Sequence, residues 1–302
     1  MKKFKSIVTG GAGFIGSNLV DRLVEEGHKV IVIDNFVSGK KDNLSHHSKK
    51  NVKIIKSDIS NNRKLYKHFK GVNYVFHLAG LAEIVPSIEN PRKYFMNNTL
   101  GTLNILEAAK QVKIKKFIYA ASSSCYGTPK KIPTRETDKI DTKHPYAFTK
   151  FLGEEAVIKY ANFFRMPNIS CRFFNVYGPR LNRTSQYGAV FSNFLTQKKR
   201  HKPLTIVGNG RQTRDFIHVD DLTNAFVILA KSNLKNKIYN LGSGKETSIN
   251  KIASTIGGKK IFISKRPGDP NRSCANISKI KKDIRWQPKI SINEGIMRLF
   301  KD

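Results

Sequence analysis

The sequence is poor in cysteine and acidic residues, and it has no long apolar run. Its three cysteines, Cys125, Cys171 and Cys274, are too widely spaced for a disulfide framework or a cysteine metal site, so we expect reduced thiols. Charged residues interrupt each apolar run before the roughly 18 residues that a membrane span needs. The start, MKKFKSIVTGG, lacks the apolar core and cleavage site of a secretory signal. We therefore expect a cytoplasmic protein with no membrane contact.

Basic residues outnumber acidic ones. The chain has 55 Lys and Arg but 22 Asp and Glu, which gives a formal net charge of +33. Such a charge is typical of proteins that bind nucleic acid or another anionic partner. The basic residues are nevertheless scattered in short groups such as KKFK, SKKN, IKK and QKKR, and no arginine-rich stripe or nucleic-acid-binding motif is present. We expect no nucleic-acid partner, and only a general attraction for anionic ligands such as nucleotide phosphates.

The first half of the chain alternates β-rich runs with helix-like segments. The runs lie at 5–10, 28–34, 52–58, 72–79 and 116–123, and the helix-like segments include 14–27 and 98–111. At 302 residues and 39% hydrophobic, the chain can bury a large core. The alternation predicts right-handed βαβ units and an α/β fold with a Rossmann-like, doubly wound parallel sheet.

The regular alternation fades from about Asn175. Loops rich in glycine and proline follow, among them YGPR, GNGR, LGSGK and KRPGDP, together with the helix-like runs DLTNAFVILAK and SINEGIMRLF. We predict a nucleotide-binding domain over residues 1–174, with a returning segment near 215–240, and a smaller mixed α/β substrate-binding domain over residues 175–302.

A glycine-rich loop, TGGAGFIG, directly follows the first β-rich run and opens a helix-like segment. Gly10 permits a tight turn, Gly13 lets the backbone approach a pyrophosphate, and Gly16 allows close packing of helix on strand. The helix N-terminus would offer its amides to the phosphates. Asp34 ends the second run, where a carboxylate can bond the adenosine ribose and repel a 2′-phosphate, so the pattern favours NAD over NADP.

A second motif, HPYAFTKFLGEEA, places Tyr146 and Lys150 four residues apart at the start of a helix after Pro145. Side chains at this spacing share one face of a helix. A nearby ammonium favours the phenolate and would lower the pKa of the tyrosine, which makes the pair a usable general base. Alone, this spacing is common on helix surfaces, but here it follows a phosphate loop and a strand with several serines.

Six motifs, GGAGFIG, HLAG, SSSCYG, YAFTK, RFFNVYGPR and TRDFIHVDD, occur in this order. Together they resemble the extended short-chain dehydrogenase/reductases that modify nucleotide-diphosphate sugars, most of all the UDP-hexose 4-epimerases, and the likeness covers nearly the whole chain. The resemblance implies an NAD-binding Rossmann-like domain, a smaller sugar-nucleotide domain, and an active site between them. It also implies a homodimer, formed through a four-helix bundle from residues 91–111 and 145–164.

The resemblance implies roles for individual residues. The catalytic set would be Ser122, Tyr146 and Lys150. The cofactor-binding residues would be Gly10, Gly13, Phe14, Ile15, Gly16, Asp34, Asn35, Ser38, Asp58, Ile59, Leu78, Ala79, Gly80, Asn97, Tyr146 and Lys150. The substrate-binding residues would be Ser122, Ser123, Asn175, Arg214, Arg266, Asp269 and Ser273.

The chain departs from that family pattern at two positions. Ala82 stands where many galactose epimerases have a lysine that contacts the cofactor. Ser273 stands where glucose-restricted epimerases often have a bulky tyrosine. A small residue there leaves room for a 2-acetamido group, so UDP-N-acetylglucosamine and UDP-N-acetylgalactosamine join UDP-glucose and UDP-galactose as predicted substrates.

The motifs thus predict 4-epimerisation of a UDP-hexose through a transient 4-keto sugar, with Tyr146 as the base and NAD as the hydride acceptor. Related reactions stay open: UDP-glucuronate epimerisation, decarboxylation and 4,6-dehydration. By resemblance, 4,6-dehydratases carry an Asp-Glu pair where this chain has Ser123 and Ser124, and decarboxylases carry a glutamate at the second position. These serines favour epimerisation.

Three other possibilities are weighed less. Cys125 lies one residue before Tyr126, which would turn its thiol away from the position used by the cysteine-dependent epimerases, so we expect it to be buried. The histidines His77, His144, His201 and His218 lack ligand spacing, and we predict no metal. A non-catalytic NAD-binding or nucleic-acid-associated protein is the alternative from another class.

Overall fold

The structure, a computed structural model, describes residues 4–61, 63–181, 190–264 and 271–300. The chain divides into two compact units. The first runs to Cys125 and takes in Thr142–Arg172 and Thr223–Tyr239, and the second holds Tyr126–Asp141, Phe173–Leu222 and the chain from Asn240. Residues 126–141, which the sequence division assigned to the first domain, thus group with the second unit. The functional roles of the two domains stay a prediction.

A seven-stranded sheet forms the centre of the first unit, in the order β10-β6-β5-β4-β1-β2-β3. The paired strands from β3 through β1 to β5 run parallel, which confirms the predicted Rossmann-like α/β fold. The bounds are β1 (Lys5–Thr9), β2 (Lys29–Asp34), β3 (Val52–Lys56), β4 (Tyr74–His77), β5 (Lys116–Ser122), β6 (Asn168–Phe173) and β10 (Lys237–Leu241).

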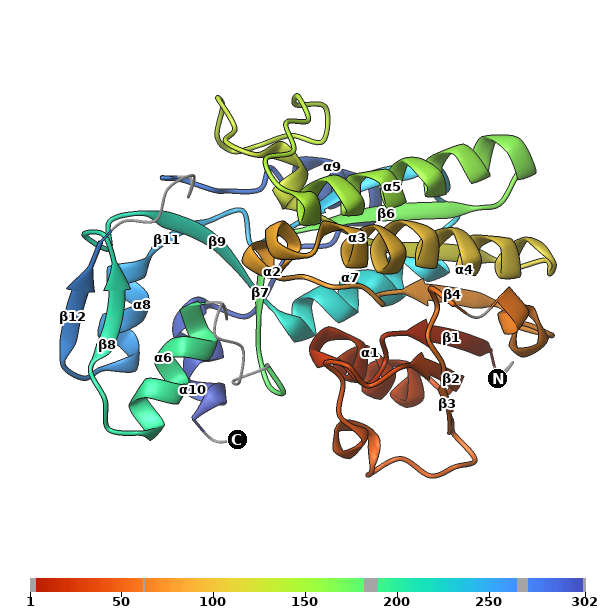
Figure 1. Ribbon diagram of the computed structural model, residues 1–302, viewed down its shortest axis with the longest axis horizontal. Coiled ribbons are helices and arrows are strands. Elements are labelled where there is room, and N and C mark those ends of the chain that lie inside the picture. The colour runs from red at the N-terminus through yellow and green to blue at the C-terminus, as the bar shows by residue number, and fades with distance from the viewer. Residues whose placement is uncertain (1–3, 62, 182–189, 265–270, 301–302) are drawn as a thin grey trace. The chain divides into compact units, whose positions relative to one another are not determined.

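Helices cover both faces of the sheet at its centre, because the side chains of β1, β4 and β5 are buried on both sides. The elements, drawn in Figure 1, are α1 (Phe14–Glu25), η1 (Lys41–Leu44), η2 (Arg63–His68), α2 (Ile84–Glu89), α3 (Pro91–Tyr94), the π-helical η3 (Phe95–Leu100), α4 (Gly101–Lys110), η4 (Ser123–Tyr126), α5 (Pro145–Phe164) and α7 (Val219–Lys231).

Alternation along each strand decides which helices lie on which face. Ile7, Val75 and Tyr119 join a core cluster with residues of α4 and α5. Their neighbours in sequence point the other way, where the Phe76 ring lies 6.2 Å from the Phe226 ring of α7. The predicted helix at 98–111 begins earlier than expected and has a π-helical first part, η3.

The order of the strands places a topological switch point between β1 and β4. The chain goes from β1 to β2 and β3 on one side, and then returns to β4 on the other side of β1. In open α/β sheets, ligands bind in the crevice at the carboxyl ends of the strands where this reversal occurs. The glycine-rich loop follows β1, and residues 78–80 follow β4, so two predicted cofactor segments flank this crevice.

The second unit contains two small sheets. One has the order β11-β9-β7, and in the other β12 pairs with β8 in parallel. Its elements are β7 (Asn175–Tyr177), α6 (Val190–Lys199), β8 (Leu204–Val207), β9 (Thr213–His218), β11 (Glu246–Ser248), α8 (Ile249–Ile256), β12 (Lys260–Ile263), α9 (Ser278–Ile284) and α10 (Ile292–Leu299). A separate apolar core, which includes Phe191, Phe216 and Ile252, joins β7, α6, β8, β9, α8 and α10.

Within the part of the chain that the structure describes, no helix combines the length and the apolarity needed to cross a membrane.

Candidate active site

The glycine-rich loop packs directly against the loop after β4. Gly10 has a φ of 68°, in the left-handed region, and a Cβ there would lie 2.8 Å from the Ala79 amide nitrogen. A Cβ on Gly16 would lie 2.1 Å from the Gly10 carbonyl oxygen. Gly13 precedes α1 and has no side chain to cap it, so the first amides of the helix, at Phe14 and Ile15, face the loop uncapped. The loop therefore has the form of an anion cradle.

Asp34 is fixed at the end of β2 by two backbone amides. Its Oδ2 accepts a hydrogen bond from the Ala12 amide at 2.9 Å, and its Oδ1 accepts one from the Phe36 amide at 2.8 Å. The Ala12 carbonyl in turn accepts hydrogen bonds from the Lys40 amide at 3.0 Å and from Asn43 Nδ2 at 2.8 Å. The carboxylate, the glycine loop and the segment after β2 are therefore held as one piece.

Four other predicted cofactor residues, Asn35, Ser38, Asp58 and Ile59, lie shortly after β2 or after β3. Asn35 Nδ2 donates to Asp58 Oδ2 at 3.2 Å, and the Ser60 hydroxyl donates to Asp58 Oδ1 at 2.7 Å. Partial burial opposes ionisation of Asp58, but the hydrogen bonds from Ser60 and Asn35 outweigh it and lower the pKa of this carboxyl. Ile59 is buried in the core, whereas Ser38 is exposed.

A buried chain of hydrogen bonds joins β1, β4 and η3, and its direction can be assigned. The Thr102 hydroxyl donates to the Asn98 carbonyl at 2.6 Å, so it must accept the hydrogen bond from His77 Nε2 at 2.9 Å. His77 Nδ1 is then an acceptor, and the Thr9 hydroxyl donates a hydrogen bond to it at 2.6 Å. Burial lowers the pKa of His77 to about 3, which agrees with a neutral ring.

This chain of hydrogen bonds ends at the loop after β4, which holds the predicted cofactor residues Leu78, Ala79 and Gly80. The Ala79 amide donates to Thr9 Oγ1 at 3.2 Å. Asn98 pins the next part of the loop, because its Oδ1 accepts from the Leu81 amide at 2.8 Å and its Nδ2 donates to the Leu81 carbonyl at 3.0 Å. Asn98 Nδ2 also donates to Thr149 Oγ1 of α5 at 3.1 Å. The predicted residue Asn97 instead donates to the Lys93 carbonyl at 2.9 Å.

Tyr146 and Ser122 come together from α5 and the end of β5. The Tyr146 hydroxyl donates to Ser122 Oγ at 3.1 Å. Ser122 Oγ also accepts from the Ser124 amide at 3.2 Å and shares a further hydrogen bond with Ser124 Oγ. His144 caps α5 by accepting from the Ala147 amide, and its ring stacks on the Tyr146 ring with centroids 5.8 Å apart. The phenol is thus held from both sides.

Lys150 is buried one turn further along α5. Its Nζ lies 4.4 Å from the centre of the Tyr119 ring, within cation–π range. Burial lowers the pKa of Lys150 to about 7, although Glu154 acts in the opposite direction. Burial also raises the pKa of Tyr146, despite its hydrogen bonds with Ser122 and Ser124. The sequence predicted a lowered tyrosine pKa, and the structure differs because loss of water outweighs the neighbouring groups.

A buried ion pair lies behind Lys150. Glu154, one turn after Lys150, accepts from Arg172 NH2 at 2.6 Å and from Arg172 Nε at 3.1 Å, and the Ser170 hydroxyl donates to it at 2.7 Å. The side chains of Glu154 and Arg172 are 1% and 4% exposed, so water contributes almost nothing to this pair. The ion pair joins α5 to β6, one turn of α5 beyond Lys150.

The predicted substrate residues lie in the second unit, apart from Ser122 and Ser123. Asn175 in β7 donates to the Asp215 carbonyl at 3.0 Å, and Arg214 in β9 donates to the Thr213 carbonyl at 2.8 Å. These two residues therefore occupy adjacent strands of one small sheet. Ser273 is half-buried. Arg266 and Asp269 lie outside the described residues.

Cys125 is buried, as expected, with 2% of its surface exposed. Burial raises the pKa of its thiol to about 12. A thiol with this pKa holds its proton at neutral pH and is a poor acid or base, so the described geometry gives it a packing role.

A sequence profile described as the NAD dependent epimerase/dehydratase family matches residues 6–242 of this chain. The chain belongs to that family. The family predicted from the sequence motifs is confirmed. NAD is confirmed as the cofactor of the family, because the description of the family names it.

Relatives in the family differ in their reactions. UDP-glucuronic acid decarboxylase 1 of Arabidopsis thaliana is 36% identical over 315 residues, which cover 100% of this chain and 70% of that protein. UDP-glucose 4-epimerase of Mycolicibacterium smegmatis is 34% identical and covers 97% and 96% of the two chains. The structure of a UDP-N-acetylglucosamine 4-epimerase from Methanobrevibacter ruminantium M1, in complex with UDP-N-acetylmuramic acid, is 33% identical, has a TM-score of 0.93 and covers 100% and 99%.

The first unit of this epimerase/dehydratase family member fits NAD. Gly10 and Gly16 leave no room for a side chain at the loop, the N-terminus of α1 is uncapped, and the Asp34 carboxylate is held beside the loop. These features match a pyrophosphate and a ribose without a 2′-phosphate. The role of each predicted cofactor residue stays a prediction.

Sequence reasoning missed several residues that position this site. Thr9, Asn98 and Thr102 have ordinary polar identities, and His77 was assigned only a structural role. His144 was not connected with Tyr146. The signal was present in part, because His77 and Asn98 belong to the segments HLAG and FMNNTLG, yet their partners lie on other elements and only the folded chain brings them together.

Proposed function

We propose that this protein is an NAD-dependent 4-epimerase of a UDP-hexose. The observation that carries the proposal is the hydrogen bond from the Tyr146 phenol to Ser122, beside a second hydroxyl at Ser124. The phenol can exchange a proton with a sugar hydroxyl, while Ser122 aligns the oxygen. The first unit would hold the cofactor and the second would hold the UDP moiety, through Asn175, Arg214 and the undescribed Arg266 and Asp269. A cytoplasmic location belongs to the same proposal.

NAD, when bound, would supply a hydride acceptor for carbon 4 of the sugar. Tyr146 would take the proton of the 4-hydroxyl and later return it. The neutral pair of Tyr146 and Lys150 holds the same number of protons as the phenolate and ammonium pair. Burial lowers the pKa of Lys150 to about 7 and raises that of Tyr146, so it favours the neutral pair, and the phenolate that acts as the base would be the minor form.

Decarboxylation of UDP-glucuronate is the second candidate, because a decarboxylase is 36% identical. Residue 124 argues against it. Ser124 is neutral, and its hydroxyl is engaged with Ser122. By the family resemblance, an enzyme that removes carbon dioxide or water carries an acidic residue there. No group of that kind occupies this position.

The substrate experiment separates these reactions. The purified protein is incubated with UDP-glucose, UDP-N-acetylglucosamine and UDP-glucuronate in turn, and the products are followed by NMR. We expect 4-epimers from one or both of the first two sugars, because Ser273 leaves room at carbon 2. Formation of a UDP-pentose or of a 4-keto-6-deoxy sugar would contradict the proposal and identify the competing reaction.

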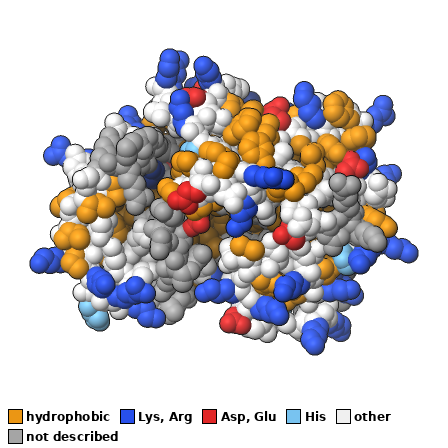
Figure 2. Space-filling model, viewed as in Figure 1, with side chains coloured by type: hydrophobic (Ala, Val, Ile, Leu, Met, Phe, Trp, Pro, Cys, Tyr) orange, Lys and Arg blue, Asp and Glu red, His pale blue; other side chains and the backbone are white. Residues whose placement is uncertain are grey.

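We also propose a homodimer that forms through the helices around α5. Large apolar side chains are exposed on neighbouring elements, and the rings of Phe95 in η3 and Phe148 in α5 touch edge to face, 5.8 Å apart. Ile84 and Ile88 of α2 are also exposed, and α2 and α3 both contact α5. Figure 2 shows apolar side chains gathered where Figure 1 places α2, α3 and the start of α5.

The dimer proposal is tested by sedimentation. We expect the unsubstituted protein to sediment as a dimer and Phe95→Asp as a monomer, because burial of a carboxylate in an apolar interface is costly. Phe262→Asp is the matched control, since Phe262 is 59% exposed but lies in β12 of the second unit. A monomeric unsubstituted protein, or a dimeric Phe95→Asp, would disprove this interface.

A further inference from the structure

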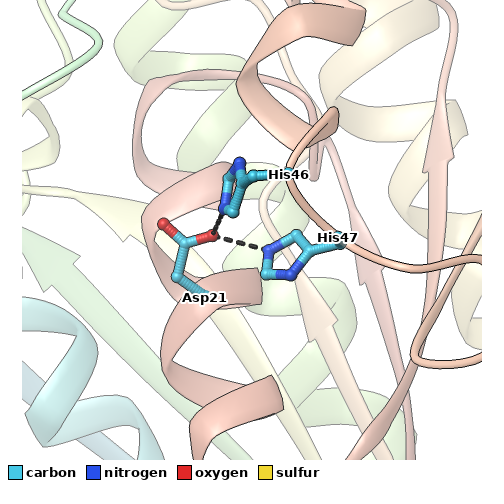
Figure 3. A group of neighbouring side chains, drawn as sticks. All are labelled: Asp21, His46 and His47. Carbon is cyan, nitrogen blue, oxygen red and sulfur yellow. Dashed lines mark hydrogen bonds and ion pairs between the residues drawn. The ribbon is translucent and has the colours of Figure 1, made fainter.

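Two adjacent histidines and an aspartate converge on the surface of the first unit. Asp21 lies on α1, and His46 and His47 lie in the segment after η1 (Figure 3). His46 Nε2 lies 2.9 Å from Asp21 Oδ1, and His47 Nε2 lies 2.7 Å from the same oxygen. The two imidazole rings are 4.1 Å apart. Both histidines therefore aim the same ring nitrogen at one carboxylate.

The geometry suits one metal ion bound by all three residues. One donor atom from each of the three residues lies within 4.8 Å of the other two. Ligands at zinc distances of about 2.0–2.2 Å are roughly 3.3–3.6 Å apart in a tetrahedron, so the observed contacts need to open by about 0.4–0.9 Å. The side chains of Asp21, His46 and His47 are 22%, 52% and 10% exposed, which leaves an open side for water ligands.

We propose that Asp21, His46 and His47 form a binding site for a borderline divalent transition metal ion, of which Zn²⁺ is the representative. Two neutral imidazoles and one carboxylate are ligands that such ions prefer over Mg²⁺ or Ca²⁺, which favour oxygen alone. Each neutral imidazole then carries its proton on Nδ1 and offers the Nε2 lone pair to the ion, so coordination needs the Nδ1–H tautomer and no net loss of protons. The carboxylate offsets part of the charge of the ion.

The site would clamp the segment that follows β2. At one end, the Lys40 amide and Asn43 Nδ2 both donate to the Ala12 carbonyl in the glycine-rich loop. At the other end, His46 and His47 reach Asp21 on the helix that this loop opens. A metal ion at the second point replaces two hydrogen bonds by three coordinate bonds, to Asp21, His46 and His47, so residues 40–47 are held firmly at both ends. The clamp depends only on the first unit and is independent of the proposed reaction.

The test measures zinc binding to the whole chain. Protein treated with chelator and freed of it is titrated with Zn²⁺ by calorimetry in about 0.15 M salt, which screens the positive charge of the chain. We expect one Zn²⁺ per chain. His47→Asn and Asp21→Asn should each weaken the affinity at least about tenfold, and the double change His46→Asn/His47→Asn should abolish saturable binding. The matched control, His201→Asn, replaces an exposed histidine of the second unit and should bind as the unsubstituted protein does.

A second measurement reports on the clamp itself. Zinc should slow amide hydrogen exchange in residues 40–47 of the unsubstituted protein and leave that of His46→Asn/His47→Asn unchanged. Two results would overturn the proposal: absence of one-to-one binding by the unsubstituted protein, or an affinity in Asp21→Asn and His47→Asn equal to that of the unsubstituted protein. Either would mean that the three side chains form only a hydrogen-bonded cluster.

Discussion

Replacement of Tyr146 by phenylalanine is expected to lower turnover by about 10² to 10⁴. The change removes only the phenolic oxygen, which donates to Ser122 at 3.1 Å, and keeps the ring that stacks on His144. The fold should therefore persist while proton transfer is lost. The measurement is the initial rate of 4-epimer formation by NMR, with far-UV circular dichroism to confirm folding.

The matched control is Tyr160→Phe, on the same helix. Tyr160 donates its hydrogen bond to Glu107 of α4 and not to Ser122. This substitution loses a partly exposed hydrogen bond and should leave turnover close to that of the unsubstituted protein. If Tyr146→Phe turned over as fast as Tyr160→Phe, the phenol would not be the base, and the proposed mechanism would be wrong.

Replacement of Arg172 by methionine is expected to reduce the free energy of unfolding by about 3–5 kcal/mol. The substitution leaves the Glu154 carboxylate buried at 1% exposure, without its cation and with Ser170 as a remaining donor. A desolvated charge without a partner is among the largest single-residue penalties known in proteins. The loss is measured by urea unfolding, followed by far-UV circular dichroism.

Two further variants separate the charge effect from a packing effect. Arg200→Met makes the same change at an exposed site near the end of α6 and should be nearly neutral. The double variant Glu154→Leu/Arg172→Met removes both charges and should recover most of the lost stability, because a buried pair can often be replaced by apolar groups. If the double variant were as unstable as Arg172→Met, loss of packing would account for the effect.

The sequence was sufficient where local pattern determines structure. Alternating apolar runs predicted the parallel sheet, since strands buried on both faces must be apolar throughout. The glycine spacing predicted the close approach at Gly10 and Gly16, where a Cβ would lie 2.8 Å and 2.1 Å from the nearest backbone atom. The Ser122 and Tyr146 contact also followed from motifs, although 24 residues separate them.

The remaining features depend on contacts between distant segments. Asn98 and His77 are ordinary residues in isolation, and their role arises from Thr9, Thr102 and Leu81. The cluster around Asp21 joins positions 25 and 26 residues apart that share no motif. The pKa of Tyr146 was predicted in the wrong direction because sequence spacing shows a neighbouring charge but does not show how much water burial removes.

The position of β10 has a consequence for synthesis of the chain on the ribosome. β10 is the neighbour of β6 in the large sheet, yet it follows β6 by on the order of 60 residues, which require several seconds to translate. During this interval β6 presents an unpaired edge, the kind of surface on which nascent chains pair wrongly. Slow translation or early release within residues 174–236 should therefore favour aggregation, and chaperones that shield strand edges should matter most at this stage.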